Sequence, residues 1–245
     1  MHQIIATAVI KGGTGKTTTA AALAQAAAAA GERVLAIDCD PQANLTFFLA
    51  ANQNLPGCYQ VLHGTPAAEV IQTTQQGIDV ISASPDLATE KTTPASAKRL
   101  QKAIEPLKKV YDWIFIDTPP QMGELTFNAL QAATGLIIPL ETDSNSLQGL
   151  YQIIEIAHQM QRSNPALAIR GVILTRYDAR PKINRALQEA IEVAGQELGA
   201  PFLGVIRPGI AIREAQAMQL SIFDYAASSK PAQDYKSIFN SLQEG

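Results

Sequence analysis

Short runs of apolar residues alternate along this chain with longer segments of helical periodicity. Continuous apolar runs predict buried strands at residues 3–10, 33–37, 78–82, 113–116, 136–139, 169–174 and 202–205. Apolar positions at three- and four-residue spacing predict helices at residues 16–30, 94–109, 147–161, 183–198 and 231–242. Such an alternation is typical of a mostly parallel sheet with helices on both faces. The expected fold class is therefore α/β, with a mostly parallel twisted sheet.

Glycine and proline mark several of the predicted boundaries. Gly31 follows the first helix, where a glycine commonly ends a helix, and Pro94 suits the first turn of a later one. No repeat and no long linker divides the 245 residues, so we expect one domain over residues 1–245. Residues 83–93 combine proline, serine and threonine and are predicted to form a mobile loop.

Composition narrows the class of protein. The chain is 47% hydrophobic and 17% charged, which is typical of a globular protein. Its net charge of −3 does not predict nucleic-acid binding, so a DNA partner would need a local basic surface. The longest apolar stretch, residues 19–30, falls short of the roughly 20 residues that span a bilayer. We therefore expect a cytoplasmic protein without stable membrane insertion.

The spacing of the cysteines and histidines predicts neither a metal site nor a disulfide framework. Cys39 and Cys58 have no metal-ligand spacing and are predicted to be reduced thiols. The three histidines are scattered along the chain.

A glycine-rich loop between the first strand and the first helix is the clearest functional signal. It reads Lys11-Gly12-Gly13-Thr14-Gly15-Lys16-Thr17-Thr18. Glycines let backbone N–H groups curl around phosphate oxygens, and the following helix N-terminus adds partial positive charge. This context predicts a P-loop that binds nucleotide phosphates through residues 12–18. Lys16 would neutralise the β- and γ-phosphates, and the Thr17 hydroxyl would bind Mg²⁺.

The loop departs from the common P-loop pattern. GxxxxGK[ST] requires glycine where Ile10 stands, whereas KGGxGKT, with a further lysine at Lys11, matches. A glycine-rich turn without a ligand is the simple alternative. The position of the glycines, lysines and threonines directly between a strand and a helix disfavours this alternative.

Carboxylates follow two of the predicted strands. Asp117 ends the apolar run 113–116, and Asp38 and Asp40 follow the run 33–37. Carboxyl ends of parallel strands face the ligand crevice of an open α/β sheet. Asp117 is therefore predicted to hold the Mg²⁺ hydration shell. Of Asp38 and Asp40, one could contact the metal shell and the other could orient the attacking water. Solvated turn carboxylates are the alternative for either pair alone.

These motifs together resemble the ParA/MinD family of deviant Walker P-loop ATPases. The resemblance rests on KGGTGKTT at 11–18, DCDPQANLT at 38–46, FIDTPP at 115–120 and RPGIAIREA at 207–215, and is closer to ParA and Soj than to MinD. It implies that Lys11 is a signature lysine that reaches the partner's phosphates in an ATP-bound homodimer. It also implies that Asp40 positions water, that Asp117 is the Walker-B acid, and that the segment at Arg207 and Pro208 lies against the adenine.

The same resemblance implies a partition role. ParA proteins bind DNA non-specifically as ATP dimers and are released through a ParB-like partner. The basic window 162–185 carries six basic residues against one acid, a balance of +5. Within and near it, the DNA-binding candidates are Arg180, Lys182, Arg185 and Arg213. An ordinary solvated face is the alternative. Because the first strand begins at residue 3, we do not expect the additional DNA-binding domain of larger plasmid ParA proteins.

Other functions remain open at this point. A MinD-like membrane ATPase would need a basic amphipathic C-terminal helix, but residues 234–245 carry one lysine against two acids. An ATPase that positions protein cargo on the nucleoid is hardly separable by sequence. A redox protein such as the nitrogenase iron protein would need paired cluster-binding cysteines. A binding module with a dead site conflicts with the presence of Lys16, Asp40 and Asp117.

Overall fold

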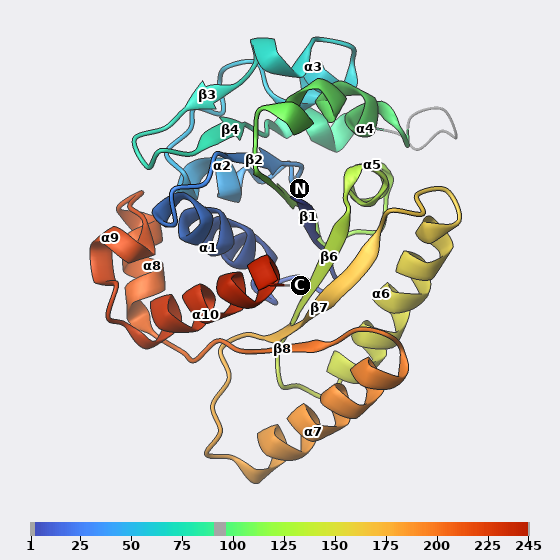
Figure 1. Cartoon of the computed structure of the whole chain (residues 1–245), viewed down its shortest axis with the longest axis vertical. Coiled ribbons are helices and arrows are strands. Elements are labelled where there is room, and N and C mark those ends of the chain that lie inside the picture. Colours follow the sequence, from blue (N-terminus) through green and yellow to red (C-terminus); the bar gives the residue numbers. More distant parts are fainter. Residues whose placement is uncertain (1–2, 91–96, 245) are drawn as a thin grey trace.

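The computed structural model describes residues 3–90 and 97–244 and is built on one eight-stranded sheet (Figure 1). The strands are β1 (Gln3–Thr7), β2 (Val34–Asp38), β3 (Gln72–Thr73), β4 (Asp79–Ile81), β5 (Trp113–Asp117), β6 (Gly135–Leu140), β7 (Ala168–Leu174) and β8 (Phe202–Val205). Their order is β3-β4-β2-β5-β1-β6-β7-β8. All neighbouring pairs are parallel except β3–β4. The predicted α/β class is confirmed.

Helices cover both faces of this sheet (Figure 1). One face carries α1 (Lys16–Ala29), α2 (Asn44–Phe48), α8 (Ile210–Ala217), α9 (Ile222–Ala226) and α10 (Lys230–Glu244). The other carries α3 (Cys58–Leu62), α4 (Arg99–Ile104), α5 (Glu124–Ala132), α6 (Ser146–Gln161) and α7 (Lys182–Glu197). Three 3₁₀ turns, η1 (Ala67–Glu69), η2 (Pro85–Thr89) and η3 (Glu105–Lys109), complete the second layer.

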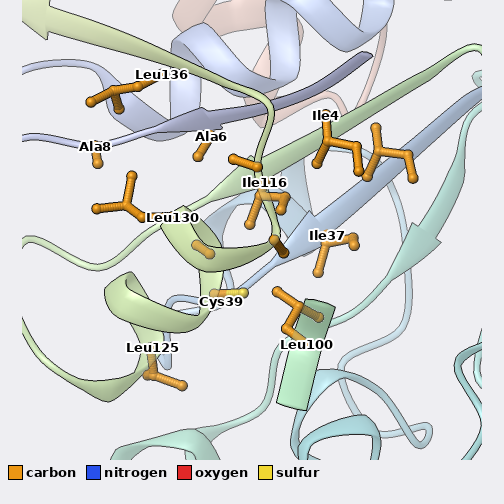
Figure 2. Close-up of a cluster of buried hydrophobic side chains, with 14 of the residues drawn as sticks. Ile4, Ala6, Ala8, Ile37, Cys39, Leu100, Ile116, Leu125, Leu130 and Leu136 are labelled. Atoms are coloured by element: carbon orange, nitrogen blue, oxygen red, sulfur yellow. The ribbon is translucent and has the colours of Figure 1, made fainter. Parts of the chain in front are cut away.

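Successive side chains of the central strands pack into two separate hydrophobic cores, one on each face of the sheet. In β1, Ile4 and Ala6 join the core under α4 and α5, which Figure 2 shows, while Ile5 joins the core under α1. All three side chains are fully buried. Burial on both faces explains why these strands read as continuous apolar runs rather than as alternating ones.

The first helix ends as its sequence predicts. Gly31 has φ +87°, and its N–H donates to Ala28 O while that of Glu32 donates to Ala27 O. This is the double hydrogen bond of a glycine-terminated helix. The strand before it is shorter than predicted, because residues 8–10 leave the sheet and lead into the glycine loop.

The helix predicted at residues 94–109 is wrong in extent. Residues 94–96, including Pro94, lie outside the described residues, and α4 begins only at Arg99 and ends at Ile104. Pro106 lacks an N–H and cannot donate the next hydrogen bond of an α-helix, to the carbonyl four residues earlier. The chain therefore continues as the 3₁₀ turn η3.

Several short elements were not predicted at all. The helices α2, α3 and α9 have five residues each, too few to show a helical period. Part of the predicted loop 83–93 forms η2, in which Leu87 is buried, while residues 91–93 lie outside the described range. No helix in the described part of the chain is both long and apolar enough to cross a bilayer.

Candidate functional site

The carboxyl ends of the parallel strands gather the predicted chemistry at one edge of the sheet. The glycine loop follows β1, the turn 38–40 follows β2, and Asp117 ends β5. The chain after β8 leads to Arg207 at the same edge. An open α/β sheet binds ligands at this edge, where its strand order reverses around β1.

The glycine loop is braced from outside by the chain that follows β7. Gly13 and Gly15 have φ of +78° and +88°, which explains glycine at both positions. Thr175 Oγ1 donates to Thr14 O at 2.8 Å, and an Arg176 guanidinium nitrogen donates to Gly13 O at 2.5 Å. These contacts fix the path of the loop from its outer side, so its inner face can bind a ligand.

Lys16 is held in a buried cationic position at the start of α1. Its side chain is 6% exposed, and its Nζ donates to Lys11 O at 3.1 Å. Burial lowers the pKa of Lys16, while the nearby charges of Asp117 and Asp40 raise it. The negative charge of a bound polyphosphate would offset the hydration that burial takes from the ammonium group.

Asp117 is the group best suited to hold a metal ion. It is fully buried, and its Oδ1 accepts from Thr7 Oγ1 at 3.3 Å. Its Oδ2 has no hydrogen-bond partner among the described residues. Burial raises the pKa of Asp117 well above its usual range, the charge of Asp38 adds to this, and the nearby Thr17 hydroxyl opposes it. A buried carboxylate oxygen without a partner, beside Thr17, fits a divalent cation.

Asp38 braces the turn that carries Asp40. Its Oδ2 accepts from Thr46 N and Thr46 Oγ1, both at 2.8 Å, and its Oδ1 accepts from Asp40 N at 3.0 Å. Burial raises the pKa of Asp38 to about 6. Both oxygens therefore have partners, one in the turn 38–40 and one on α2, and a metal-binding role for Asp38 stays a prediction. Asp40 is 8% exposed and close enough for its charge to act on Lys16.

A cavity of about 450 Å³ continues from the glycine loop toward α8. It is lined by Gly15, Thr18, Thr175, Arg176, Ile206, Arg207, Pro208, Gly209, Ile210, Ile212, Arg213, Gln216 and Tyr235. Arg207 and Pro208 thus line a cavity that begins at the glycine loop, and their contact with the adenine stays a prediction. The Arg207 guanidinium makes a two-pronged ion pair with Asp234 on α10, with contacts of 2.6 to 3.1 Å. This pair fixes one wall of the cavity.

Lys11 points toward its own chain in this structure. Its Nζ lies 2.5 Å from Asp143 Oδ2, in the turn between β6 and α6. Burial alone would raise the pKa of Asp143, but the Lys11 ammonium and local hydrogen bonds lower it. The Lys11 side chain is 43% exposed, so it can reach other groups by exchanging this contact.

The DNA-binding candidates fall into two places. Arg180, Lys182 and Arg185 share the chain between β7 and the start of α7, whereas Arg213 lies on α8 and lines the nucleotide-sized cavity. Arg180 is 90% exposed but forms an ion pair with Asp178 at 2.7 Å. Arg185 donates to Ala179 O at 2.9 Å.

The basic window as a whole does not form one surface. Arg162 follows α6, Arg170 lies on β7 and donates to Leu242 O, and Arg176 contacts the glycine loop and Glu141. The count of +5 therefore overstates the local charge.

Sequence reasoning missed four residues that shape the site. Glu141 and Asp143 follow β6, Arg176 follows β7, and Asp234 pairs with Arg207. The first three could have been found, because polar residues directly after parallel strands face the ligand edge. Asp234 could not, since its role depends on how α10 packs.

Comparison with known proteins agrees with this geometry. A family model described as an AAA domain matches residues 2–169. The sporulation initiation inhibitor protein Soj of Bacillus subtilis is 36% identical over 246 residues, which cover 96% of this chain and 96% of Soj. The chromosome partitioning protein ParA of Myxococcus xanthus is 34% identical over 243 residues, which cover 96% of this chain and 85% of that protein.

A solved structure extends the agreement to the fold. Cobyrinic acid a,c-diamide synthase from Mycobacterium smegmatis, with bound ADP and magnesium, is 28% identical and superposes with a TM-score of 0.82. The match covers 100% of this chain and 95% of that one. A protein solved with bound ADP and magnesium is thus similar to this chain over its whole length.

Proposed function

The chain belongs to the ParA/MinD family of P-loop ATPases, and from that premise we propose that it is a Mg²⁺-dependent ATPase of the ParA type. The observation that supports this most directly is the buried, unpartnered Oδ2 of Asp117 beside Lys16 and the glycine loop. A polyphosphate with its divalent cation supplies the charges that this arrangement lacks.

The residues divide the work of hydrolysis between them. The N–H groups of residues 12–18 hold the phosphates, and Lys16 neutralises the β- and γ-phosphates. Thr17 and Asp117 would hold Mg²⁺, with Asp38 close by, and the cation would supply charge neutralisation at the phosphates. Asp40 orients the attacking water. Arg207 and Pro208 form the wall against which the adenine lies.

We further propose that ATP binding controls DNA binding by causing two subunits to dimerise. Lys11 leaves Asp143 and reaches the phosphates of a partner subunit in an ATP-bound homodimer. The dimer binds DNA non-specifically through Arg180, Lys182 and Arg185, with Arg213 at the neighbouring α8. A ParB-like partner stimulates hydrolysis and releases the DNA, so that the cycle moves plasmid, chromosomal or mobile-element DNA in the cytoplasm, at the nucleoid.

The C-terminal helix bears on the MinD-like alternative. Tyr235, Ile238, Phe239 and Leu242 of α10 are buried against the sheet rather than exposed. An amphipathic membrane helix would need these apolar residues free to enter the bilayer interface. The packing of α10 therefore favours the partition proposal over a membrane-positioning ATPase.

Light scattering after size-exclusion chromatography tests the assembly step. We expect the wild type to dimerise with ATP and Mg²⁺ but to stay monomeric with ADP. Lys16→Ala should lose nucleotide binding, and Lys11→Ala should bind ATP yet stay monomeric. Equal dimerisation of Lys11→Ala and wild type would contradict the role proposed for Lys11.

Charge reversal tests the DNA surface. Arg180→Glu and Arg185→Glu should weaken DNA binding and leave ATP affinity unchanged, whereas Arg162→Glu, at the far end of α6, serves as the matched control. Each lost phosphate contact should reduce the slope of log affinity against log salt by about 1. If Arg162→Glu weakened binding as much as the other two, the proposed surface would be wrong.

A further inference from the structure

The fold brings the two cysteines of this chain together. Cys39 lies in the turn 38–40 after β2, and Cys58 is the first residue of α3. Their Sγ atoms are 3.7 Å apart, although 19 positions separate them in sequence. Both are free thiols with side chains that are 1% and 0% exposed. The two sulfurs are therefore in direct contact in the interior.

Neighbouring strands hold each cysteine in place. Cys39 N donates to Asp117 O at 3.1 Å, and Cys58 N donates to Ser82 O at 2.8 Å. A Cβ at Gly57 would collide with the Ser82 carbonyl, so only glycine lets the chain pass this closely before Cys58. Both backbones are thus anchored to the sheet, at the ends of β5 and β4, which flank β2. These backbone contacts hold the two cysteines side by side in the fold.

We propose that Cys39 and Cys58 are a redox modification site: a peroxide converts them to a reversible intrachain disulfide that restrains the turn carrying Asp40 and slows ATP hydrolysis. A disulfide has an S–S distance of about 2.05 Å, so the sulfurs need to approach by roughly 1.7 Å. Side-chain rotation and small shifts of the turn 38–40 supply such a movement. The effect on hydrolysis rests on the role proposed for Asp40, whereas the disulfide itself does not.

The chemistry balances with hydrogen peroxide as the oxidant. One of the two cysteines loses its proton, and its thiolate attacks one peroxide oxygen, which breaks the O–O bond and leaves a sulfenic acid. The released hydroxide takes up the proton as water. The sulfur of the other cysteine then attacks the sulfenic acid sulfur, and the displaced hydroxide leaves with the second thiol proton as a second water. Two thiols and one peroxide give one disulfide and two waters.

Burial of both sulfurs sets the pace of the reaction. Because both sulfurs are buried, oxidation requires a local opening and should be slow compared with that of an exposed thiol.

Thiol counting on the full-length protein tests the proposal. After peroxide treatment, denaturation and maleimide labelling, we expect both cysteines to be blocked and peptide mapping to show residue 39 linked to residue 58 within one chain. Dithiothreitol should restore both thiols. Two maleimide-reactive thiols after treatment, or a covalent dimer in place of the intrachain link, would overturn the proposal.

ATPase assays test the consequence with matched variants. Peroxide should lower wild-type hydrolysis several-fold, with recovery in dithiothreitol, and should leave Cys58→Ala and Cys39→Ala unaffected. An intrachain disulfide with unchanged hydrolysis would refute the restraint on the turn. Absence of hydrolysis before oxidation would instead count against the proposed ATPase, because the thiol count is measured without nucleotide.

Discussion

Removal of one hydroxyl group should loosen the turn that carries Asp40. Thr46 Oγ1 donates to Asp38 at 2.8 Å and accepts from Ala83 N at 2.9 Å, and Asp38, Thr46 and Ala83 are all buried. Thr46→Val keeps the shape of the side chain but removes both bonds. A hydrogen bond to a charged group contributes about 1.5–3 kcal/mol, and a buried N–H left without a partner costs about 1–3 kcal/mol.

Thr46→Val should therefore lower the free energy of unfolding by about 3–5 kcal/mol. For a chain of this size, that corresponds to a fall in Tm on the order of 10 °C. Thermal and urea denaturation, followed by circular dichroism, measure both quantities. Thr89→Val is the matched control, because the exposed Thr89 hydroxyl donates only to Asp86 O and its loss should cost less than about 0.5 kcal/mol. A loss below about 1 kcal/mol in Thr46→Val would show that these two hydrogen bonds do not stabilise the turn.

Three further changes give distinct expectations. Gly57→Ala should destabilise the fold by roughly 3 kcal/mol or more, because the added Cβ would collide with the Ser82 backbone. Gly149→Ala, where a Cβ on α6 would meet open space, should instead stabilise the fold by about 0.5–1 kcal/mol. Urea denaturation measures both changes. Burial raises the pKa of Tyr235 from 10.0 to about 12. The stabilising contribution of the neutral phenol is complete below pH 10, and the free energy of unfolding should fall by about 2–3 kcal/mol as the pH rises toward 12. Tyr235→Phe should lack this loss in pH-dependent denaturation, and equal curves for wild type and variant would contradict the prediction. Asp234→Ala should free Arg207 and weaken ATP binding roughly three- to tenfold, about 1 kcal/mol, in a fluorescent-nucleotide titration. Unchanged affinity would show that the Arg207–Asp234 ion pair does not contribute to nucleotide binding.

Much of this fold could be predicted from the sequence because the signals are local. Strands buried on both faces leave continuous apolar runs, and the glycine loop between β1 and α1 reads directly from its spacing. Pro106, within the helix predicted at 94–109, is a local signal for an earlier helix end, and the chain there forms η3. The five-residue helices could not be predicted, because they owe their helical form to tertiary contacts such as that of Thr46 N with Asp38.

The candidate site divides in the same way. Residues in the glycine loop and at strand ends were placed correctly because sequence position sets their location on a parallel sheet. Contacts between distant segments were not predictable, and they include Lys11 with Asp143 and the two cysteines with each other. The basic window 162–185 illustrates the limit of counting charges, since a strand and a helix distribute its arginines over separate surfaces.

DNA binding that depends on ATP tests the proposed switch most directly. A mobility-shift assay with non-specific duplex DNA would compare ATP, ADP and no nucleotide at two salt concentrations, with wild type and Lys11→Ala. We expect binding only with ATP, weaker at the higher salt, and lost in Lys11→Ala. DNA binding that is equal in all nucleotide states, or absent in each of them, would contradict the account of this chain as an ATP-driven DNA switch.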